Sequence, residues 1–172
     1  MRGYIFLLFL FVFVLTACSS ERSLQEWEKE VKERPINIAY VGEKPNIEVD
    51  GVTFVSYTSV DGGYEALWID ESEIENFTSE EVISDIKSIL KDEKLVVFLG
   101  ESIPYTIASE LGIRGYEEAK GGNIVQTGYH LWYENGEKRL GISGVTEDAP
   151  VERKLLQLLE VTTNQTRNLL MR

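Results

Sequence analysis

Two residues of this chain could act together as a nucleophile and a base. Ser102 lies in the stretch FLGESIPY, directly after an apolar run, and His130, the only histidine, lies in GYHLWY. A serine hydroxyl becomes a nucleophile when a neighbouring histidine accepts its proton. If folding brings the two side chains within hydrogen-bonding distance, they could support hydrolase chemistry.

The residues around this pair fit that chemistry poorly. The order strand, Gly-x-Ser, helix resembles a nucleophile elbow, but Pro104 stands where that motif requires a second glycine. Proline fixes φ and adds a ring where the elbow backbone must pass closely. His130 lies in a predicted strand between aromatic residues, a setting more typical of a packing or edge residue than of a base. We therefore predict that Ser102 caps the following helix and assign no catalytic residue, keeping a hydrolase with a site near Ser102 as an alternative.

Other kinds of site are also poorly supported. One histidine and one cysteine cannot supply the usual zinc ligand sets. The acidic run at 69–75 lacks the spacing and central glycine of a calcium loop, and no Gly-rich phosphate loop leads into a helix. The net charge of -12 argues against nucleic acid as a partner. We predict no metal and no cofactor.

The single cysteine, Cys18, follows an apolar N-terminal run. Met1 and Arg2 form a short positive start, residues 4–14 are all apolar, and small residues precede the cysteine. This order is that of a secretory signal peptide. The run is shorter than the ~20 apolar residues that a membrane-spanning helix needs, so a spanning anchor is the weaker alternative.

The residues Leu15, Thr16, Ala17 and Cys18 resemble the lipobox of bacterial lipoproteins. The resemblance covers residues 1–18 only. It implies cleavage between Ala17 and Cys18 and a diacylglyceryl cysteine that carries fatty acyl chains such as palmitate. Two acyl chains hold a protein stably on a membrane, whereas one holds it only marginally. An incidental thiol beside a signal peptide is the alternative interpretation of Cys18.

The rest of the chain alternates between strand and helix patterns. The stretch 65–70, the amphipathic stretch 77–94 and the apolar stretch 95–100 predict a strand–helix–strand unit, with Thr78 and Glu81 as a capping box. Asn135-Gly136, within 127–145, predicts a hairpin with a type I′ turn. Further strands are expected at 36–42 and 52–60, and further helices at 102–113 and 148–170.

Two of these helices have a predicted inner face. In the 77–94 helix it comprises Val82, Ile86, Ile89 and Leu90. In the closing helix Asp148 is the predicted cap, and the inner face comprises Val151, Leu155, Leu158, Leu159 and Thr162.

Together these elements predict one α/β domain. Its sheet is partly parallel, with flanking helices and an antiparallel hairpin at one edge, in a flavodoxin-like or small Rossmann-like arrangement. Ligands of such sheets bind at the carboxyl ends of the parallel strands. The candidate ligand rim therefore comprises Asp70, Glu71, Gly100, Glu101 and Ser102.

The predicted organisation has three parts: a signal peptide (1–17), a lipid-anchored tether with a short helix (18–35) and the α/β domain (36–172). Leu24, Trp27 and Val31 fall on one face of the short helix. The helix could act as a spacer or pack against the domain. Packing is favoured, because Trp27 would otherwise be a large exposed apolar side chain.

The expected protein is a lipoprotein on the extracytoplasmic side of the cell membrane. Its acidic domain would be a non-enzymatic binding or accessory module for a small molecule, a peptide or another envelope protein. The alternatives are an extracytoplasmic hydrolase that acts on an envelope substrate, and an exclusion- or immunity-type protector lipoprotein. The only partner implied directly is the membrane, through Cys18.

Overall fold

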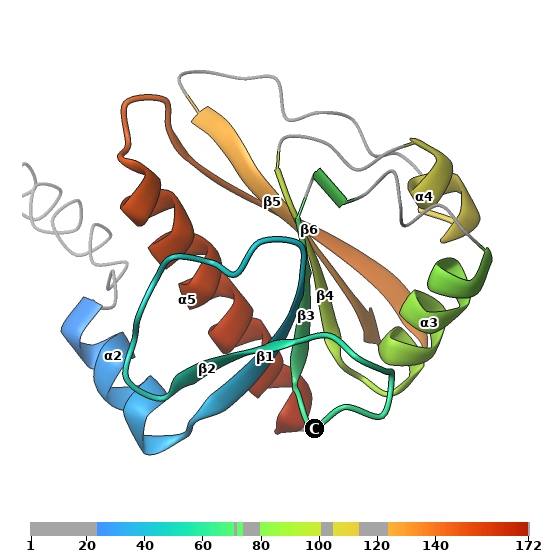
Figure 1. The fold of residues 1–172 in the computed structure, drawn as a ribbon, viewed down its shortest axis with the longest axis horizontal. Coiled ribbons are helices and arrows are strands. Elements are labelled where there is room, and N and C mark those ends of the chain that lie inside the picture. The colour runs from blue at the N-terminus through green and yellow to red at the C-terminus, as the bar shows by residue number, and fades with distance from the viewer. Residues whose placement is uncertain (1–23, 71, 74–79, 101–104, 114–123, 172) are drawn as a thin grey trace, which may run out of the picture.

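A computed structural model describes residues 24–70, 72–73, 80–100, 105–113 and 124–171. Within these residues, six strands form one mixed sheet with helices on both faces (Figure 1). In chain order the elements are α2 (Leu24–Glu33), β1 (Ile36–Val41), β2 (Val52–Ser56), β3 (Ala66–Ile69), α3 (Glu80–Lys91), β4 (Leu95–Leu99), α4 (Tyr105–Glu110), β5 (Ile124–Glu134), β6 (Glu137–Thr146) and α5 (Val151–Leu170).

The sheet has the strand order β2-β1-β3-β4-β5-β6. β1 pairs in parallel with both β2 and β3, and β3 pairs in parallel with β4. β5 runs antiparallel to β4 and forms a hairpin with β6. The predicted α/β domain with a partly parallel sheet and an antiparallel edge hairpin is therefore confirmed. The first five strands follow the flavodoxin-like order, but residues 42–51 join β1 to β2 without a helix.

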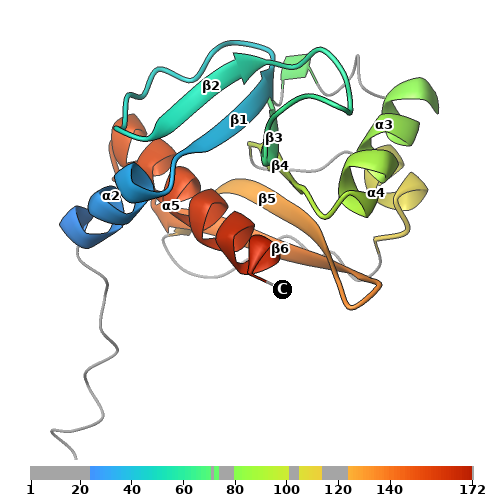
Figure 2. The same ribbon diagram turned by 90° about the horizontal axis from the view of Figure 1, so that it is seen from below.

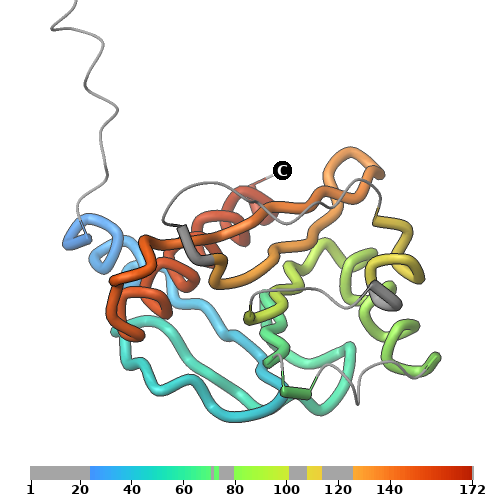
Figure 3. The backbone as a smooth tube through the Cα atoms, turned by 90° about the horizontal axis from the view of Figure 1, so that it is seen from above, coloured from blue at the N-terminus to red at the C-terminus, as the bar shows by residue number. Residues whose placement is uncertain are grey.

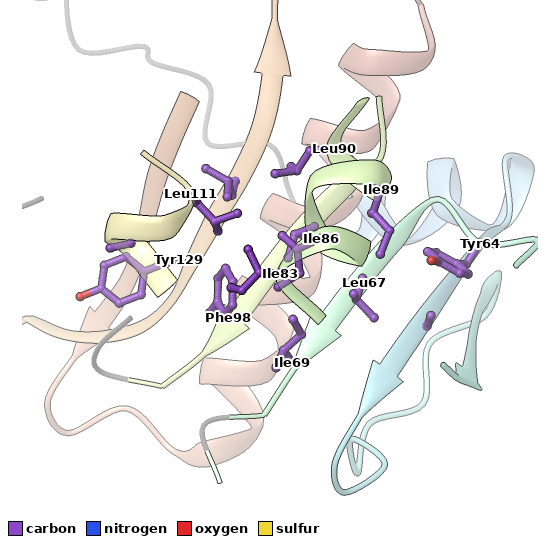
Figure 4. Close-up of a cluster of buried hydrophobic side chains, with 14 residues drawn as sticks. Tyr64, Leu67, Ile69, Ile83, Ile86, Ile89, Leu90, Phe98, Leu111 and Tyr129 are labelled. Carbon is purple, nitrogen blue, oxygen red and sulfur yellow. The ribbon is translucent and has the colours of Figure 1, made fainter. Parts of the chain in front are cut away.

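Helices cover both faces of the sheet, and each face has its own apolar cluster. α2 and α5 lie on one face and α3 and α4 on the other (Figures 2 and 3). The cluster under α3 includes Ile83, Ile86, Phe98 and Tyr129 (Figure 4). All four residues of β3 are buried. Strands buried on both faces carry continuous rather than alternating apolar runs, which is the pattern seen at 95–99.

The predicted hairpin turn and the predicted strand–helix–strand unit both agree with the structure. Asn135 and Gly136 have φ values of 53° and 78°, as a type I′ turn requires. α3 joins parallel strands β3 and β4, as predicted, although Ile83 is buried and Val82 only partly so. α3 begins at Glu80, and the proposed cap Thr78 lies outside the described residues.

Two predicted elements differ in length, and the start of α5 was predicted wrongly. β2 ends at Ser56 rather than at residue 60, and α4 covers only Tyr105–Glu110. α5 begins at Val151 after Pro150, with no side-chain cap, and Val151 is 69% exposed. The reason is Pro150, because its ring disfavours helical φ and ψ angles in the preceding residue. Asp148 therefore lies outside the helix, and the inner face begins further along it.

α2 packs against the domain through its apolar stripe. Trp27 and Val31 are fully buried, and the Trp27 indole donates a 2.8 Å hydrogen bond to the hydroxyl of Thr163 on α5. The packing alternative for the 24–33 helix thus describes the structure. The folded unit includes this helix together with the region from residue 36. No helix among the described residues is both long and apolar enough to span a membrane.

Gly51 holds the loop before β2 against the end of α2. Its φ is +89°, and a Cβ built there would lie 2.4 Å from the carbonyl oxygen of Val31. Its own carbonyl accepts a hydrogen bond from the Ile36 N–H. We expect Gly51→Ala to lower the free energy of unfolding by about 2–4 kcal/mol, because it adds backbone strain to a backbone clash.

Urea unfolding followed by circular dichroism measures this loss. Gly63→Ala is the matched control, since a Cβ at Gly63 meets no atom within 4 Å. The control should change the free energy of unfolding by less than about 1 kcal/mol, within the range of ordinary surface substitutions and glycine replacements. Equal losses in the two variants would contradict the proposed clash.

Candidate functional site

The structure places part of the predicted ligand rim at the expected sheet edge. Asp70 directly follows β3, Gly100 directly follows β4, and the two strands are neighbours. Asp70 Oδ1 accepts hydrogen bonds from the Ser72 backbone N–H at 2.9 Å and from its hydroxyl at 2.5 Å. This arrangement is a local turn, in which the carboxylate fixes its own loop. Glu71, Glu101 and Ser102 lie outside the described residues.

Gly42 brings the end of β1 close to this rim. Its φ is +99°, and a Cβ there would lie 2.7 Å from the Cβ of Asp70. From β1 the chain adds β2 on one side of the sheet and then β3 on the other side. The switch point in the strand order therefore lies between β1 and β3. The close approach at Gly42 leaves little room beside Asp70 at this switch point.

His130 has a serine partner on the neighbouring strand β6. Its Nε2 hydrogen-bonds Ser143 Oγ, and the two residues are 1% and 2% exposed. Burial lowers the pKa of His130 to about 4, so the imidazole is neutral at pH 7. A serine–histidine pair this deeply buried offers no surface to a substrate. This finding agrees with the prediction that His130 is a packing residue, and Ser102 lies outside the described residues.

The pairing could have been found from the hairpin register. Counting back from the Asn135-Gly136 turn places Ser143 opposite Gly128, with a bulge between Gln126 and Gly128. Ser143 is therefore diagonal to His130 on the same face, within reach of a long side chain.

Threonines on α5 form a polar seam beneath the helix. Trp68 Nε1 donates to Thr162 Oγ1 at 3.1 Å, and Trp27 Nε1 donates to Thr163 Oγ1 at 2.8 Å. These bonds join β3 and α2 to adjacent residues of one helix. Buried indoles need such partners, because an unpaired N–H in an apolar interior is costly. The seam therefore fixes how α2 and α5 pack on the sheet.

A groove opens where α2 and α5 end, and we call it the helix-end groove. It consists of two cavities of ≈ 500 and ≈ 230 Å³ that share Arg34, Arg167 and Met171. The larger is also lined by Glu30, Glu33, Asn164 and Asn168. The smaller is also lined by Pro35, Ile36, Glu65, Thr166 and Leu170. The volume of the larger cavity, ≈ 500 Å³, falls within the range of small-molecule binding sites.

The electrostatics of the groove depend on one partly buried ion pair. Arg167 Nη1 lies 3.1 Å from Glu30 Oε2, and the arginine side chain is only 14% exposed. This pair links the last turn of α5 to the middle of α2 across the groove. Arginine in the last turn of a helix also interacts favourably with the helix dipole.

Sequence reasoning missed the helix-end groove. Apart from Glu65, its lining comes from residues 30–36 and 164–171, which are more than a hundred positions apart. The only available signal was the apolar stripe of α2, which predicted packing but not the partner. A further cavity of ≈ 390 Å³ lies at α3 and α4, lined by Glu80, Ile83, Ser84, Lys87 and Glu110. In the described part of the chain, no three His, Cys, Asp or Glu residues are grouped as metal ligands.

Comparison with known proteins finds no matching family model, no matching curated protein and no matching solved structure.

Proposed function

We propose that this protein is a lipoprotein anchored on the extracytoplasmic face of the cell membrane, and that its acidic α/β domain is a non-enzymatic binding or accessory module. The observation that carries the proposal is the position of Cys18. It is the only cysteine, it completes Leu15-Thr16-Ala17-Cys18, and it follows an apolar run with a positive start. A lipidated cysteine explains why the chain has one thiol and why it lies there.

A binding role has separate structural support. The helix-end groove has the size of a ligand site and combines charged, amide and apolar side chains. The one histidine is buried, neutral at pH 7 and engaged with Ser143, so it is poorly suited to act as a general base on a bound substrate. The groove supplies recognition rather than acid–base chemistry.

The decisive variant for the anchor is Cys18→Ser. In the bacterial host we expect wild-type protein in the membrane fraction, with a mass that includes a diacylglyceryl group on Cys18. The variant should lack this added mass, and less of it should be found in the membrane fraction. Without acyl chains the domain has no buried CH₂ groups to hold it on the bilayer. Intact-mass spectrometry and membrane fractionation measure both effects.

Thr16→Ser is the matched control. It changes the tolerant position of the lipobox-like stretch and keeps the cysteine, so lipidation and membrane retention should persist. Wild-type protein with an unmodified Cys18 thiol would disprove the anchor. Equal membrane retention of wild type and Cys18→Ser would show that another segment holds the protein there.

A further inference from the structure

We propose that the helix-end groove binds the carboxyl end of a peptide whose last side chain is apolar. The inference rests on the proposed binding function and names its site and ligand class. Three properties of the groove carry it: an available guanidinium, a set of hydrogen-bond acceptors and an adjoining apolar cavity.

The available guanidinium is that of Arg34. Arg34 is exposed at the end of α2, lines both cavities and forms no ion pair within the described part of the chain. Each acidic residue of the groove has a partner other than Arg34: Glu30 pairs with Arg167 at 3.1 Å, Glu33 with Lys29 at 3.9 Å, and Glu65 accepts from the Asn37 N–H at 2.8 Å. Arginine binds carboxylates through two parallel hydrogen bonds, so a single carboxylate suits Arg34.

The acceptors come from the helix ends. α2 and α5 both finish at this groove, and the last carbonyl groups of a helix lack partners inside it. These groups carry partial negative charge, and the three glutamates that line the two cavities outnumber the two arginines. Such surroundings disfavour a multiply charged anion. They suit a ligand with one carboxylate and its own N–H donors, which is the composition of a peptide's carboxyl end.

The smaller cavity supplies an apolar pocket beside the arginine. Pro35, Ile36, Leu170 and Met171 line it. Leu170 and Met171 are 71% and 67% exposed, although apolar side chains of this size are commonly buried. Because the cavity has ≈ 230 Å³, it is suited to one side chain rather than to a long chain. A covering ligand would remove this apolar surface from water.

One buried hydroxyl in the wall supports the same view. Thr166 is 3% exposed and lines the smaller cavity, and its Oγ1 has no hydrogen-bond partner among the described residues. Buried polar groups are rarely left unpaired, and an exception often marks a place where water or a ligand completes the structure. The neighbouring threonines Thr162 and Thr163 both have partners.

Calorimetric titration of the full-length protein in detergent tests the proposal. The probes are N-acetyl-Gly-Gly-Leu with a free carboxylate and the same tripeptide as its carboxamide, each up to about 10 mM, which reaches weak binding. The free acid should bind saturably at one site, and the amide should bind at least about tenfold more weakly, the loss typical of a charge-assisted hydrogen bond. Replacing the last leucine by serine should also weaken binding.

Arg34→Ala is the key variant, and Arg153→Ala is its matched control. Arg153 is an exposed arginine at the other end of α5, so both variants remove the same charge. Arg34→Ala should weaken the free acid at least about tenfold and leave the amide unchanged, whereas Arg153→Ala should change neither. Both variants should keep the wild-type unfolding midpoint, because each replaces an exposed side chain.

Four results would overturn the proposal. They are equal affinity for acid and amide, equal effects of Arg34→Ala and Arg153→Ala, tighter binding of inorganic phosphate or octanoate than of the peptide, and no saturable binding by N-acetyl-Gly-Gly-Leu or by the same tripeptide ending in phenylalanine or methionine. The anchor is judged separately by the mass of Cys18. Peptide binding by a protein with an unmodified Cys18 would support the proposed binding site and contradict the proposed lipid anchor. A lipidated Cys18 without peptide binding would support the anchor alone.

Discussion

Replacing Trp68 by alanine is expected to lower the free energy of unfolding by about 3–5 kcal/mol, the usual cost of emptying a large buried aromatic site. Trp68 is fully buried in β3. Its ring meets Phe54 edge to face at 5.4 Å between centroids, and its indole donates to Thr162 on α5. The substitution therefore removes apolar contacts on β2 and a hydrogen bond to the helix that covers this face of the sheet.

Urea unfolding monitored by circular dichroism measures the loss, and conservative variants separate its parts. Trp68→Phe keeps much of the apolar volume and removes the indole donor. Thr162→Val removes the acceptor. In a double-mutant cycle these two changes should couple by about 0.5–1.5 kcal/mol, the net value of one hydrogen bond. A loss below about 1 kcal/mol for Trp68→Ala would show that Trp68 does not anchor α5.

Acid is expected to destabilise the wild-type protein by about 3 kcal/mol more than a His130→Gln variant between pH 7 and pH 4. Burial lowers the pKa of His130 from 6.5 to about 4 in the folded state. Below pH 6.5 the unfolded chain binds a proton at this position, whereas the folded chain stays neutral until about pH 4. The folded state thus loses stability as pH falls through this window, at about 1.4 kcal/mol per pH unit.

The free energy of unfolding is compared as a function of pH between the wild type and His130→Gln. The many carboxylates titrate in both proteins, so the difference between the two curves reports the contribution of His130. Urea midpoints at pH 7, 5.5 and 4 give the two curves. Ser143→Ala serves as the control, because it removes the hydrogen-bond partner and retains the buried imidazole. We expect its pH dependence to follow the wild type. Parallel curves for the wild type and His130→Gln would show that His130 is accessible to protons in the folded protein.

Features encoded by neighbouring residues could be predicted from the sequence. The Asn135-Gly136 turn and the β3–α3–β4 unit depend on local turn chemistry and apolar periodicity, and both agree with the structure. The start of α5 was wrong although its signal is also local. Asp148 is a favoured cap residue, but Pro150 determines where helical geometry can begin.

Features that depend on distant residues could not be predicted. The helix-end groove exists only because α2 packs beside α5, and no local pattern in residues 24–35 specifies that partner. The parallel pairing of β1 and β2 without an intervening helix was also out of reach, since such strands usually need a longer crossover. For His130, the hairpin register would have indicated Ser143 rather than Ser102.

The packing of α2 determines how far from the bilayer the protein would work. Under the proposed anchoring, six Cα-to-Cα steps separate Cys18 from Leu24 and span at most about 20 Å. α2 then extends about 15 Å from Leu24 to Glu33, and the helix-end groove lies at its far end. The domain would stand close to the membrane, and its groove would lie at the end of α2 that is further along the chain from the anchor. A soluble chain end could therefore enter the groove without first meeting the anchored end of the helix.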